Sequence, residues 1–403
     1  MRESLPDVQR IEKSREGKER RSGYDRRKGQ DRRAKSDRMG ESALLENAYE
    51  PGVNQTKKVS PHLADFIRWM PKVELHMHLE GCIRASTANA LIKRNHPGHK
   101  TLGNAGILKL YRFNSLSDFV YSMGKVSDNL KSPQDLARVA QETFSALIAQ
   151  NVRYVEFDCA LSKYLKLGYP LNVIVDAIKE VVSGLETEYD FKAKMLANII
   201  RHHGPETARS LVEQLIDLSD DFIVGIGLSG DEKAFPAPMF KDTFDLARKA
   251  GLKITVHAGE DDGPVSVWDA LNTLNAHRID HGIRSMDDES LVRYLKKHNI
   301  PVTQCLTSNL RLGLVDSLDD HPFRSFYDQG LTVSLHTDDP EIFHVSLTSE
   351  FALAASQFEL GAEDIEKIVM NSVVSSFLPD DQKAEMASDI RDEFHYLRGE
   401  LFL

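Results

Sequence analysis

The sequence predicts a (β/α)8 barrel, which is a closed ring of eight parallel strands surrounded by helices. Eight apolar segments with strand character recur along the chain, and amphipathic stretches separate most of them. They extend over about 270 residues, the length that such a barrel requires. Several segments end in His or Asp followed by Gly or Pro, at the strand end where parallel α/β proteins carry out chemistry. The alternative is a doubly wound open sheet, but no Gly-rich phosphate loop follows the first segment.

The expected elements follow in chain order. The strands are residues 72–77, 153–158, 194–200, 222–228, 253–257, 278–281, 301–305 and 331–336. The helices between strands are residues 172–189, 206–218, 240–250, 266–276, 287–298 and 322–329. Residues 82–150 contain helical patterns at 116–129 and 133–150, and we expect a helical cap over the barrel mouth there. After the last strand, residues 345–360, 363–376 and 380–399 read as closing helices.

Composition divides the chain into two parts. Residues 1–60 are rich in charged residues, Ser and Gly, with almost no aromatic or branched apolar residues, and this predicts a disordered tail. Within it, an acid–Arg–Arg unit returns every six residues, at Glu19, Asp25 and Asp31. Residues 1–38 carry 14 Lys/Arg and 8 Asp/Glu, which is a net charge of +6. Since the whole chain has a net charge of −10, the remaining residues have a net charge of −16. We expect residues 61–403 to form one barrel domain.

Composition also excludes several classes of protein. The chain has no run of 18 apolar residues, so no membrane span is expected. The first 30 residues contain no apolar region typical of a secretory signal. Cys82, Cys159 and Cys305 are far apart, which suits a reducing cytoplasm rather than a disulfide framework. The acidic body is a poor general nucleic-acid binder, and only residues 13–38 could contact RNA, anionic lipid or an acidic partner.

The first expected strand carries a candidate metal site. Val73, Leu75 and Met77 alternate with polar residues, so His76 and His78 share one face about 6–7 Å apart. Two imidazoles at this spacing can bind one metal ion. An isolated His-x-His on a strand is more often incidental, so the interpretation depends on the other strands.

Later strands end in residues of the same kind. The fifth ends at His257, with Glu260 just beyond it, and the sixth ends in His281. The eighth is followed by Asp338 and Asp339. His76, His78, His257 and Asp338 provide three imidazoles and one carboxylate, a ligand set that suits catalytic zinc with a place left for water. Zinc lowers the pKa of such a water to about 7. This leaves Glu260, His281 and Asp339 as acid/base and orienting groups.

Together these residues resemble the motifs of the adenosine deaminase family, in the family's order. The motifs are His76-x-His78-Leu-Glu-Gly, Gly230-Asp231-Glu232, His257-Ala-Gly-Glu260, Asp280-His281-Gly, Thr307-Ser308-Asn309 and Thr337-Asp338-Asp339-Pro340. The likeness extends from about residue 70 to the end and is to bacterial members. It implies a (β/α)8 barrel with one zinc ion per chain. It also implies a hydrolase of cyclic amidine C–N bonds that converts adenosine and 2′-deoxyadenosine to inosine and 2′-deoxyinosine, releasing ammonia.

The resemblance also assigns roles. His76, His78, His257 and Asp338 would hold zinc. Glu260 would protonate purine N1. His281 would orient the attacking water and help to deprotonate it. Two groups would contact the purine ring, Asp339 at N7 and the Gly230 N–H at N3. Arg201-His202 matches a family pattern without a catalytic role, and His336 is expected to be structural.

Two positions depart from adenosine-specific members. Such members usually have Asp at the ribose-contacting position where this chain has Glu80, and Glu80 is closer to deaminases of adenine or modified adenosines. The chain also lacks the acidic residue commonly found at the place of Gly227. One methylene can change selectivity by about 10–200-fold. The alternative substrates are therefore adenine and a modified adenosine or adenine nucleotide.

Two competing functions remain. Other barrel hydrolases use two metals bridged by a carboxylated Lys on the fourth strand, but residues 222–230 contain no Lys. A non-catalytic binding protein with a basic arm is the other alternative. An inactive copy should have lost ligands, whereas this sequence has them all.

Overall fold

The computed structural model describes residues 59–98, 102–113 and 116–401. The tail expected over residues 1–60 therefore lies outside the described residues, except for Val59 and Ser60. Among the described residues, no helix combines the length and the apolar character that crossing a membrane requires.

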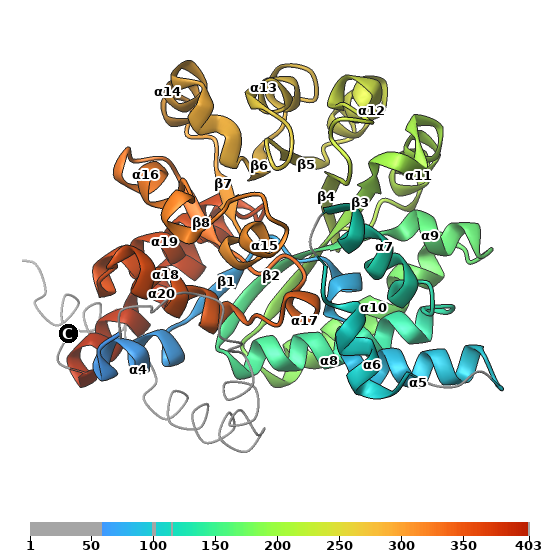
Figure 1. The fold of residues 1–403 in the computed structure, drawn as a ribbon, viewed down its shortest axis with the longest axis horizontal. Helices are drawn as coiled ribbons and strands as arrows, with labels where there is room; N and C mark the ends of the chain where they lie inside the picture. The colour runs from blue at the N-terminus through green and yellow to red at the C-terminus, as the bar shows by residue number, and fades with distance from the viewer. Residues whose placement is uncertain (1–58, 99–101, 114–115, 402–403) are drawn as a thin grey trace, which may run out of the picture.

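Eight strands form one parallel sheet in the order in which they occur in the sequence (Figure 1). They are β1 (Lys72–Glu74), β2 (Val152–Cys159), β3 (Lys192–Ile200), β4 (Ile223–Ser229), β5 (Lys253–Ala258), β6 (Arg278–His281), β7 (Val302–Gln304) and β8 (Val333–Leu335). This sequential order confirms the (β/α)8 barrel, because a doubly wound sheet would reverse its strand order partway through.

The barrel closes between its first and last strands through only a few backbone contacts. Met77 forms an isolated parallel bridge with Asp338. The His78 N–H donates to the Asp338 carbonyl at 2.8 Å, and the Asp338 N–H donates to the His76 carbonyl at 2.9 Å. We call this contact between residues 76–78 and Asp338 the seam. Residues of the expected metal site therefore also close the barrel.

The first strand is shorter than predicted. We expected residues 72–77 to form a strand, but β1 ends at Glu74. His76 and His78 lie in an extended segment beyond it, where His78 bridges to Asp158 at the end of β2. A regular strand requires continuous hydrogen bonding to its neighbours. Beyond Glu74, this segment has only isolated bridges to Asp158 and Asp338, so the strand ends there.

Helices surround the strands. Those between β2 and β8 are α9 (Leu161–Lys166), α10 (Leu171–Glu188), α11 (Pro205–Leu218), α12 (Lys241–Lys249), α13 (Pro264–Asn272), α14 (Glu289–Lys297), α15 (Leu306–Arg311) and α16 (Phe323–Asp328). Short 3-10 segments are η2 (Arg201–His203), η3 (Ala237–Phe240), η4 (Ile283–Asp287) and η5 (Leu318–Asp320). Figure 1 shows α11 to α14 side by side along one arc of the barrel.

The insertion between β1 and β2 is helical, as expected. It contains η1 (Leu79–Cys82), α5 (Ala85–Asn95), α6 (Gly103–Leu110), α7 (Leu116–Ser127) and α8 (Pro133–Ala149). Phe113 and Phe119 of this insertion pack against Phe343 of α17 (Pro340–Phe343), with ring centroids 5.6 and 5.3 Å apart. Since α17 directly follows Asp339, the insertion borders the barrel mouth beside the seam.

Helices before β1 and after α17 pack outside the first and last strands. α18 (Leu347–Phe358), α19 (Ala362–Ser375) and α20 (Asp380–Leu401) follow α17, and α4 (Pro61–Trp69) precedes β1. Helix α19 contacts both β8 and β1, and α20 packs on α4. Phe66 and Phe394 stack at 5.8 Å between these two helices. This apolar packing compensates for the sparse hydrogen bonding between the first and last strands.

Candidate active site

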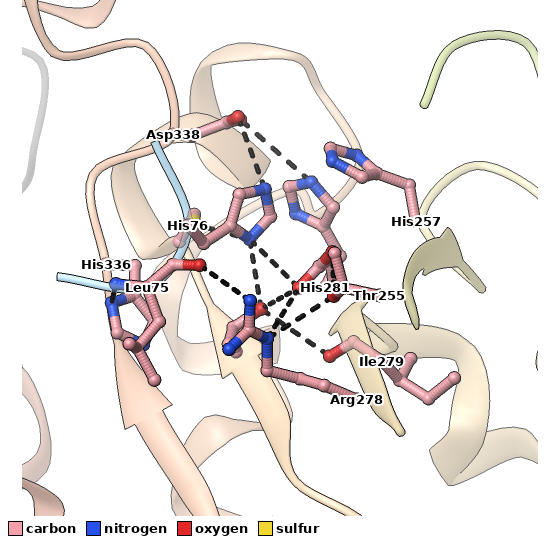
Figure 2. Close-up of polar contacts among 12 residues, drawn as sticks. Leu75, His76, Thr255, His257, Arg278, Ile279, His281, His336 and Asp338 are labelled. Atoms are coloured by element: carbon pink, nitrogen blue, oxygen red, sulfur yellow. Dashed lines mark hydrogen bonds and ion pairs between the residues drawn. The ribbon is translucent and has the colours of Figure 1, made fainter. Parts of the chain in front are cut away.

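Four buried imidazoles converge at the carboxyl ends of β1, β5 and β6. The ring centroid of His76 lies 4.7 Å from those of His257 and His281, and His78 lies 5.1 Å from His257. Figure 2 shows the side chains of His76, His257 and His281 pointing toward one another below Asp338. The strand ends therefore bring together His residues separated by up to 205 positions in the sequence.

Asp338 approaches this cluster from the end of β8. Its Oδ1 lies 3.5 Å from His76 Nε2 and 3.3 Å from His78 Nε2. The Ser308 hydroxyl donates to its Oδ2 at 2.6 Å. Asp338 adopts φ 63°, a left-handed conformation that is uncommon outside glycine. The seam hydrogen bonds hold this backbone in place.

The hydrogen bonds of His76 leave one nitrogen free to bind a cation. The Thr303 hydroxyl donates to Asp280 Oδ1 at 2.8 Å, so its oxygen accepts from His76 Nδ1–H at 3.0 Å. Neutral His76 then carries a lone pair on Nε2, which is buried and has no hydrogen-bond partner among the described residues. This lone pair faces the Asp338 carboxylate. Two buried acceptors that face each other at this distance fit a shared cation.

The local charges also favour a cation. Against the opposing effect of burial, Asp280 and Asp338 raise the pKa of His76, and Asp338 and Asp339 raise the pKa of His78. Burial raises the pKa of Asp338, but its contacts with His76 and His78 outweigh this effect and hold the pKa well below its ordinary value. These shifts show that the cluster favours positive charge beside the ionised carboxylate, and a divalent metal that displaces the protons of the two imidazoles would supply it.

The geometry groups the expected ligands. Ligand atoms of His76, His78 and His257 lie within 4.8 Å of one another. A carboxylate oxygen of Asp338 lies within the same distance of ligand atoms of His76 and His281, and also of His78 and Asp339. All four residues predicted to hold a metal therefore lie at one buried site. These residues fit one metal ion.

Glu260 lies beside two imidazoles of the cluster. Its Oε2 is 3.5 Å from His257 Nδ1, and its Oε1 is 3.6 Å from His281 Nε2. Burial, together with the nearby carboxylates of Asp338 and Glu232, raises the pKa of Glu260 well above its ordinary value. Glu260 therefore holds a proton under conditions in which an ordinary carboxyl is ionised.

Glu232 fixes the turn that carries Glu260. Its carboxylate accepts the backbone N–H groups of Gly259, Glu260 and Asp261 at 2.8, 2.9 and 3.1 Å, and also the Ser266 hydroxyl. The sequence motif containing Glu232 was noted, but this role was not predicted. A carboxylate three residues after a strand is too common a signal to indicate it.

Three further predicted residues surround the cluster. Asp339 is buried, and burial and its neighbour Asp338 raise its pKa well above the ordinary value. A Cβ at Gly81 would lie 1.9 Å from Asp339 Oδ1, so only glycine leaves room for this carboxyl. Glu80 accepts the Ala160 N–H at 3.0 Å. Gly230 follows β4 with φ 101°, which favours glycine.

Some supporting residues were not predicted. Arg201, to which no catalytic role was assigned, donates to the His257 carbonyl at 2.6 Å. Arg278 lies beneath the imidazoles (Figure 2), pairs with Glu156 at 2.7 Å and donates to the Leu75 carbonyl at 3.1 Å. These contacts link residues more than 50 positions apart, and no local pattern reports them. His336 is buried against Glu74 at 2.9 Å, in agreement with the structural role expected for it.

A carboxylate also occupies the space beside Gly227. The sequence lacks an acidic residue at this position, but Asp158 reaches it from β2, which lies beyond β3 in the sheet. A Cβ at Gly227 would lie 2.4 Å from Asp158 Oδ1. Burial raises the pKa of Asp158 to about 7, although His78 opposes the shift. The acidic group is therefore present, supplied by another strand.

Comparisons with known proteins agree with this arrangement. A family model described as adenosine deaminase matches residues 71–393. An adenine deaminase of Cupriavidus metallidurans is 33% identical over 328 residues, which cover 81% of this chain and 92% of the relative. An aminodeoxyfutalosine deaminase of Streptomyces avermitilis is 33% identical over 330 residues, with the same coverage of 81% and 92%.

Solved structures give the same result. The adenine deaminase of Arthrobacter aurescens superposes with a TM-score of 0.76 at 28% identity, covering 80% of this chain and 98% of that one. An amidohydrolase from Burkholderia ambifaria, described with bound Zn, gives 0.79 at 25% identity and covers 87% and 98%.

Proposed function

Since the chain belongs to the adenosine deaminase family and is a deaminase-type hydrolase, we propose that it removes the amino group from carbon 6 of a 6-aminopurine. One observation carries the proposal. A cluster of metal-ligand type and a buried, proton-bearing Glu260 converge on the same barrel mouth. Hydrolysis at this carbon requires a nucleophile on one side and protonation of the ring nitrogen, then of the leaving ammonia.

A metal ion fits this reaction. We propose one zinc ion per chain, held by His76, His78, His257 and Asp338. Its contribution when bound is Lewis acidity, which makes a water molecule nucleophilic near neutral pH. The nitrogen and carboxylate donors of this cluster support the assignment.

The chain's own residues would orient and protonate the substrate. Glu260 would donate its proton to purine N1, which makes carbon 6 more electrophilic. His281 would orient the attacking water. Asp339 holds a proton because of its raised pKa, so it would donate a hydrogen bond to N7. The Gly230 N–H would bind N3.

We propose adenosine and 2′-deoxyadenosine as the substrates, with inosine, 2′-deoxyinosine and ammonia as products. The Gly230-Asp231-Glu232 and Thr337-Asp338 motifs, which keep the form typical of nucleoside enzymes, support this choice. The three buried free cysteines suit a reducing compartment, and we place the enzyme in the cytoplasm.

Adenine is the second candidate substrate. Glu80 favours it, because its longer side chain occupies the ribose-contacting position and accepts the Ala160 N–H. Relatives named adenine deaminase are 32–33% identical to this chain. A 5′-modified adenosine is the third, by comparison with the relative named aminodeoxyfutalosine deaminase.

A substrate panel on the purified, zinc-loaded protein tests the proposal. Ammonia release is followed with adenosine, 2′-deoxyadenosine, adenine, AMP and a 5′-substituted adenosine. Preference for the two nucleosides supports a ribose contact by Glu80. Preference for adenine or the 5′-substituted compound replaces our substrate with that candidate. No ammonia from any compound, with one metal ion bound per chain, overturns the 6-aminopurine proposal.

A further inference from the structure

A chain of three hydrogen bonds connects His281 to a backbone amide outside the site. The Phe323 N–H donates to His321 Nδ1 at 3.1 Å. His321 Nε2 lies 3.0 Å from Asn309 Oδ1, and Asn309 Nδ2 lies 3.1 Å from His281 Nδ1. All three side chains are buried, and Asn309 belongs to the Thr307-Ser308-Asn309 motif on α15. We call this chain the Asn309 relay.

The backbone amide determines the direction of every bond in the relay. A backbone N–H can only donate, so His321 Nδ1 must carry a lone pair. Burial lowers the pKa of His321 to about 3, so at neutral pH its single ring proton is on Nε2. His321 Nε2–H therefore donates to Asn309 Oδ1, and the Asn309 amide group donates to His281 Nδ1. Neutral His281 is left with its proton on Nε2.

A relay with the His281 proton on Nδ1 instead is incompatible with the Phe323 N–H donor. A proton on His281 Nδ1 would need an acceptor, so the Asn309 amide would have to rotate by about half a turn. Its NH2 group would then face His321 Nε2, which would need a lone pair there and a proton on Nδ1. That proton would point at the Phe323 N–H, leaving two buried donors in contact. An unsatisfied buried donor costs roughly 1–3 kcal/mol.

We propose that Asn309 and His321 are positioning residues that fix the proton of His281 on Nε2, so that His281 meets the reacting atoms as a hydrogen-bond donor. Within the part of the chain that the structure describes, His281 Nε2 is buried without a hydrogen-bond partner, and it lies 3.6 Å from Glu260 Oε1 and 4.0 Å from Asp338 Oδ2. It therefore points to the place where the water and substrate would meet.

With its proton on Nε2, His281 has a narrower role than the one expected from the sequence. A donor at Nε2 can orient the oxygen of the attacking water by donating to it, but it cannot also accept that water's proton at the same nitrogen. That proton would need another acceptor, and a carboxylate lies close by, since Asp338 Oδ2 is 4.0 Å from His281 Nε2. The kinetic part of the test depends on the proposed function, whereas the spectroscopic part does not.

The spectroscopic test observes the imidazole nitrogens directly. The zinc-loaded protein is labelled with 15N-histidine, and long-range proton–nitrogen spectra distinguish Nδ1–H from Nε2–H rings. The His281→Asn and His321→Gln variants assign the two signals, and exposed His62→Gln controls for indirect shifts. We expect both His281 and His321 to carry the proton on Nε2. A proton on Nδ1 of either ring overturns the proposal.

The kinetic test inverts the last bond of the relay with little change of shape. Asp at position 309 can only accept, so Asn309→Asp should move the His281 proton to Nδ1. We expect kcat to fall about 10²–10⁴-fold with little change in KM, the range for a misplaced proton on a catalytic imidazole. His321→Gln, whose amide can still donate to Asn309, should retain more activity than His321→Leu. Unchanged kcat in Asn309→Asp, with its His281 proton moved to Nδ1, would overturn the proposal.

A purely structural role predicts a different pattern. It would lower the thermal stability of Asn309→Asp and His321→Leu without moving the His281 proton. Loss of ammonia release from wild type would contradict the proposed function, while the proton positions would still decide the relay. The two failures are therefore distinguishable.

Discussion

Glu260 combines deep burial with a raised pKa, and its replacement gives the clearest prediction for a single residue. Glu260→Gln keeps the size and hydrogen-bonding capacity of the side chain but removes its transferable proton. We expect kcat for ammonia release to fall about 10²–10⁴-fold while KM changes little. Steady-state kinetics measure this, with Glu213→Gln on the exposed face of α11 as the matched control. Activity within about tenfold of wild type would contradict the acid role.

The residues that converge at the candidate active site were easier to predict than the residues that hold them in place. His76, His257, His281 and Asp338 were found because each lies at or just beyond a strand end, a place that the hydrophobic pattern reveals. Glu232, Arg201 and Asn309 act through hydrogen bonds to partners 27 to 56 positions away. The motifs contain these three residues, but only the folded chain brings them to their partners, so a sequence pattern does not reveal these hydrogen bonds.

At the level of strands, Gly227 on β4 leaves space that Asp158 on β2 fills. A Cβ there would meet Asp158 Oδ1 at 2.4 Å, so Gly227→Ala overpacks the barrel and should lower the free energy of unfolding by about 1–3 kcal/mol. Urea unfolding measures the change. Gly184→Ala on α10, where nothing lies within 4 Å of the new Cβ, is the matched control.

The clash also predicts coupling between the two strands. Asp158→Ala removes the obstructing oxygen. The loss of unfolding free energy in the double variant should therefore be smaller than the sum of the losses in the two single variants by about 0.5–3 kcal/mol. Additive effects would mean that Gly227 is required for another reason.

Helix α18 gives a prediction about pH. Glu350 accepts the N–H and the hydroxyl of Thr307, at the start of α15. Burial raises its pKa to about 7, despite these hydrogen bonds. Since the folded pKa exceeds the unfolded one, the protonated carboxyl stabilises the fold below about pH 4.5, and this contribution is lost as pH rises through about 7.

Glu350→Gln removes this dependence. As pH rises from 5 to 8, wild type should lose up to roughly 3 kcal/mol of unfolding free energy relative to Glu350→Gln, because only wild type has a carboxyl that loses its proton at this position. Denaturant unfolding across this range measures it, and exposed Glu385→Gln is the control. Parallel pH profiles for wild type and Glu350→Gln would rule out the raised pKa.

The strands and most of the helices between them could be predicted from hydrophobic periodicity, whereas the short helix α15 could not. The eight expected strands overlap the eight observed ones, and most boundaries differ by a few residues. Helix α15 (Leu306–Arg311) has six residues, fewer than two turns, and such a segment has too few apolar positions to reveal a period. Yet α15 carries Ser308 and Asn309, which contact Asp338 and His281.

For the whole molecule, the tail and the barrel should be separable in function. All predicted site residues lie between positions 76 and 339, and the site geometry is complete within the described residues. Deleting residues 1–58 should therefore leave kcat and KM for the best substrate unchanged. Comparing the truncated and full-length chains measures this, and a large loss of turnover would mean that the tail contributes to the active site.

Metal removal should affect both activity and stability. Chelation should abolish ammonia release and lower the melting temperature, because a metal that binds only the folded chain stabilises it by mass action. One equivalent of Zn²⁺ should restore both, while His257→Ala should no longer respond to added metal. Elemental analysis gives the metal content, and activity that survives complete metal removal would contradict the proposed mechanism.

The seam has a consequence for how the cell makes this protein. The backbone of residues 76–78 has one neighbour in β2 and the other at Asp338, near the end of the barrel. Ribosomes deliver the first of these segments long before the last. A nascent chain that has not yet released Asp338 therefore lacks both a metal-ligand candidate and the contact that closes the ring. Until then the early His residues have no complete site, so metal acquisition would mark the end of synthesis rather than guide its beginning.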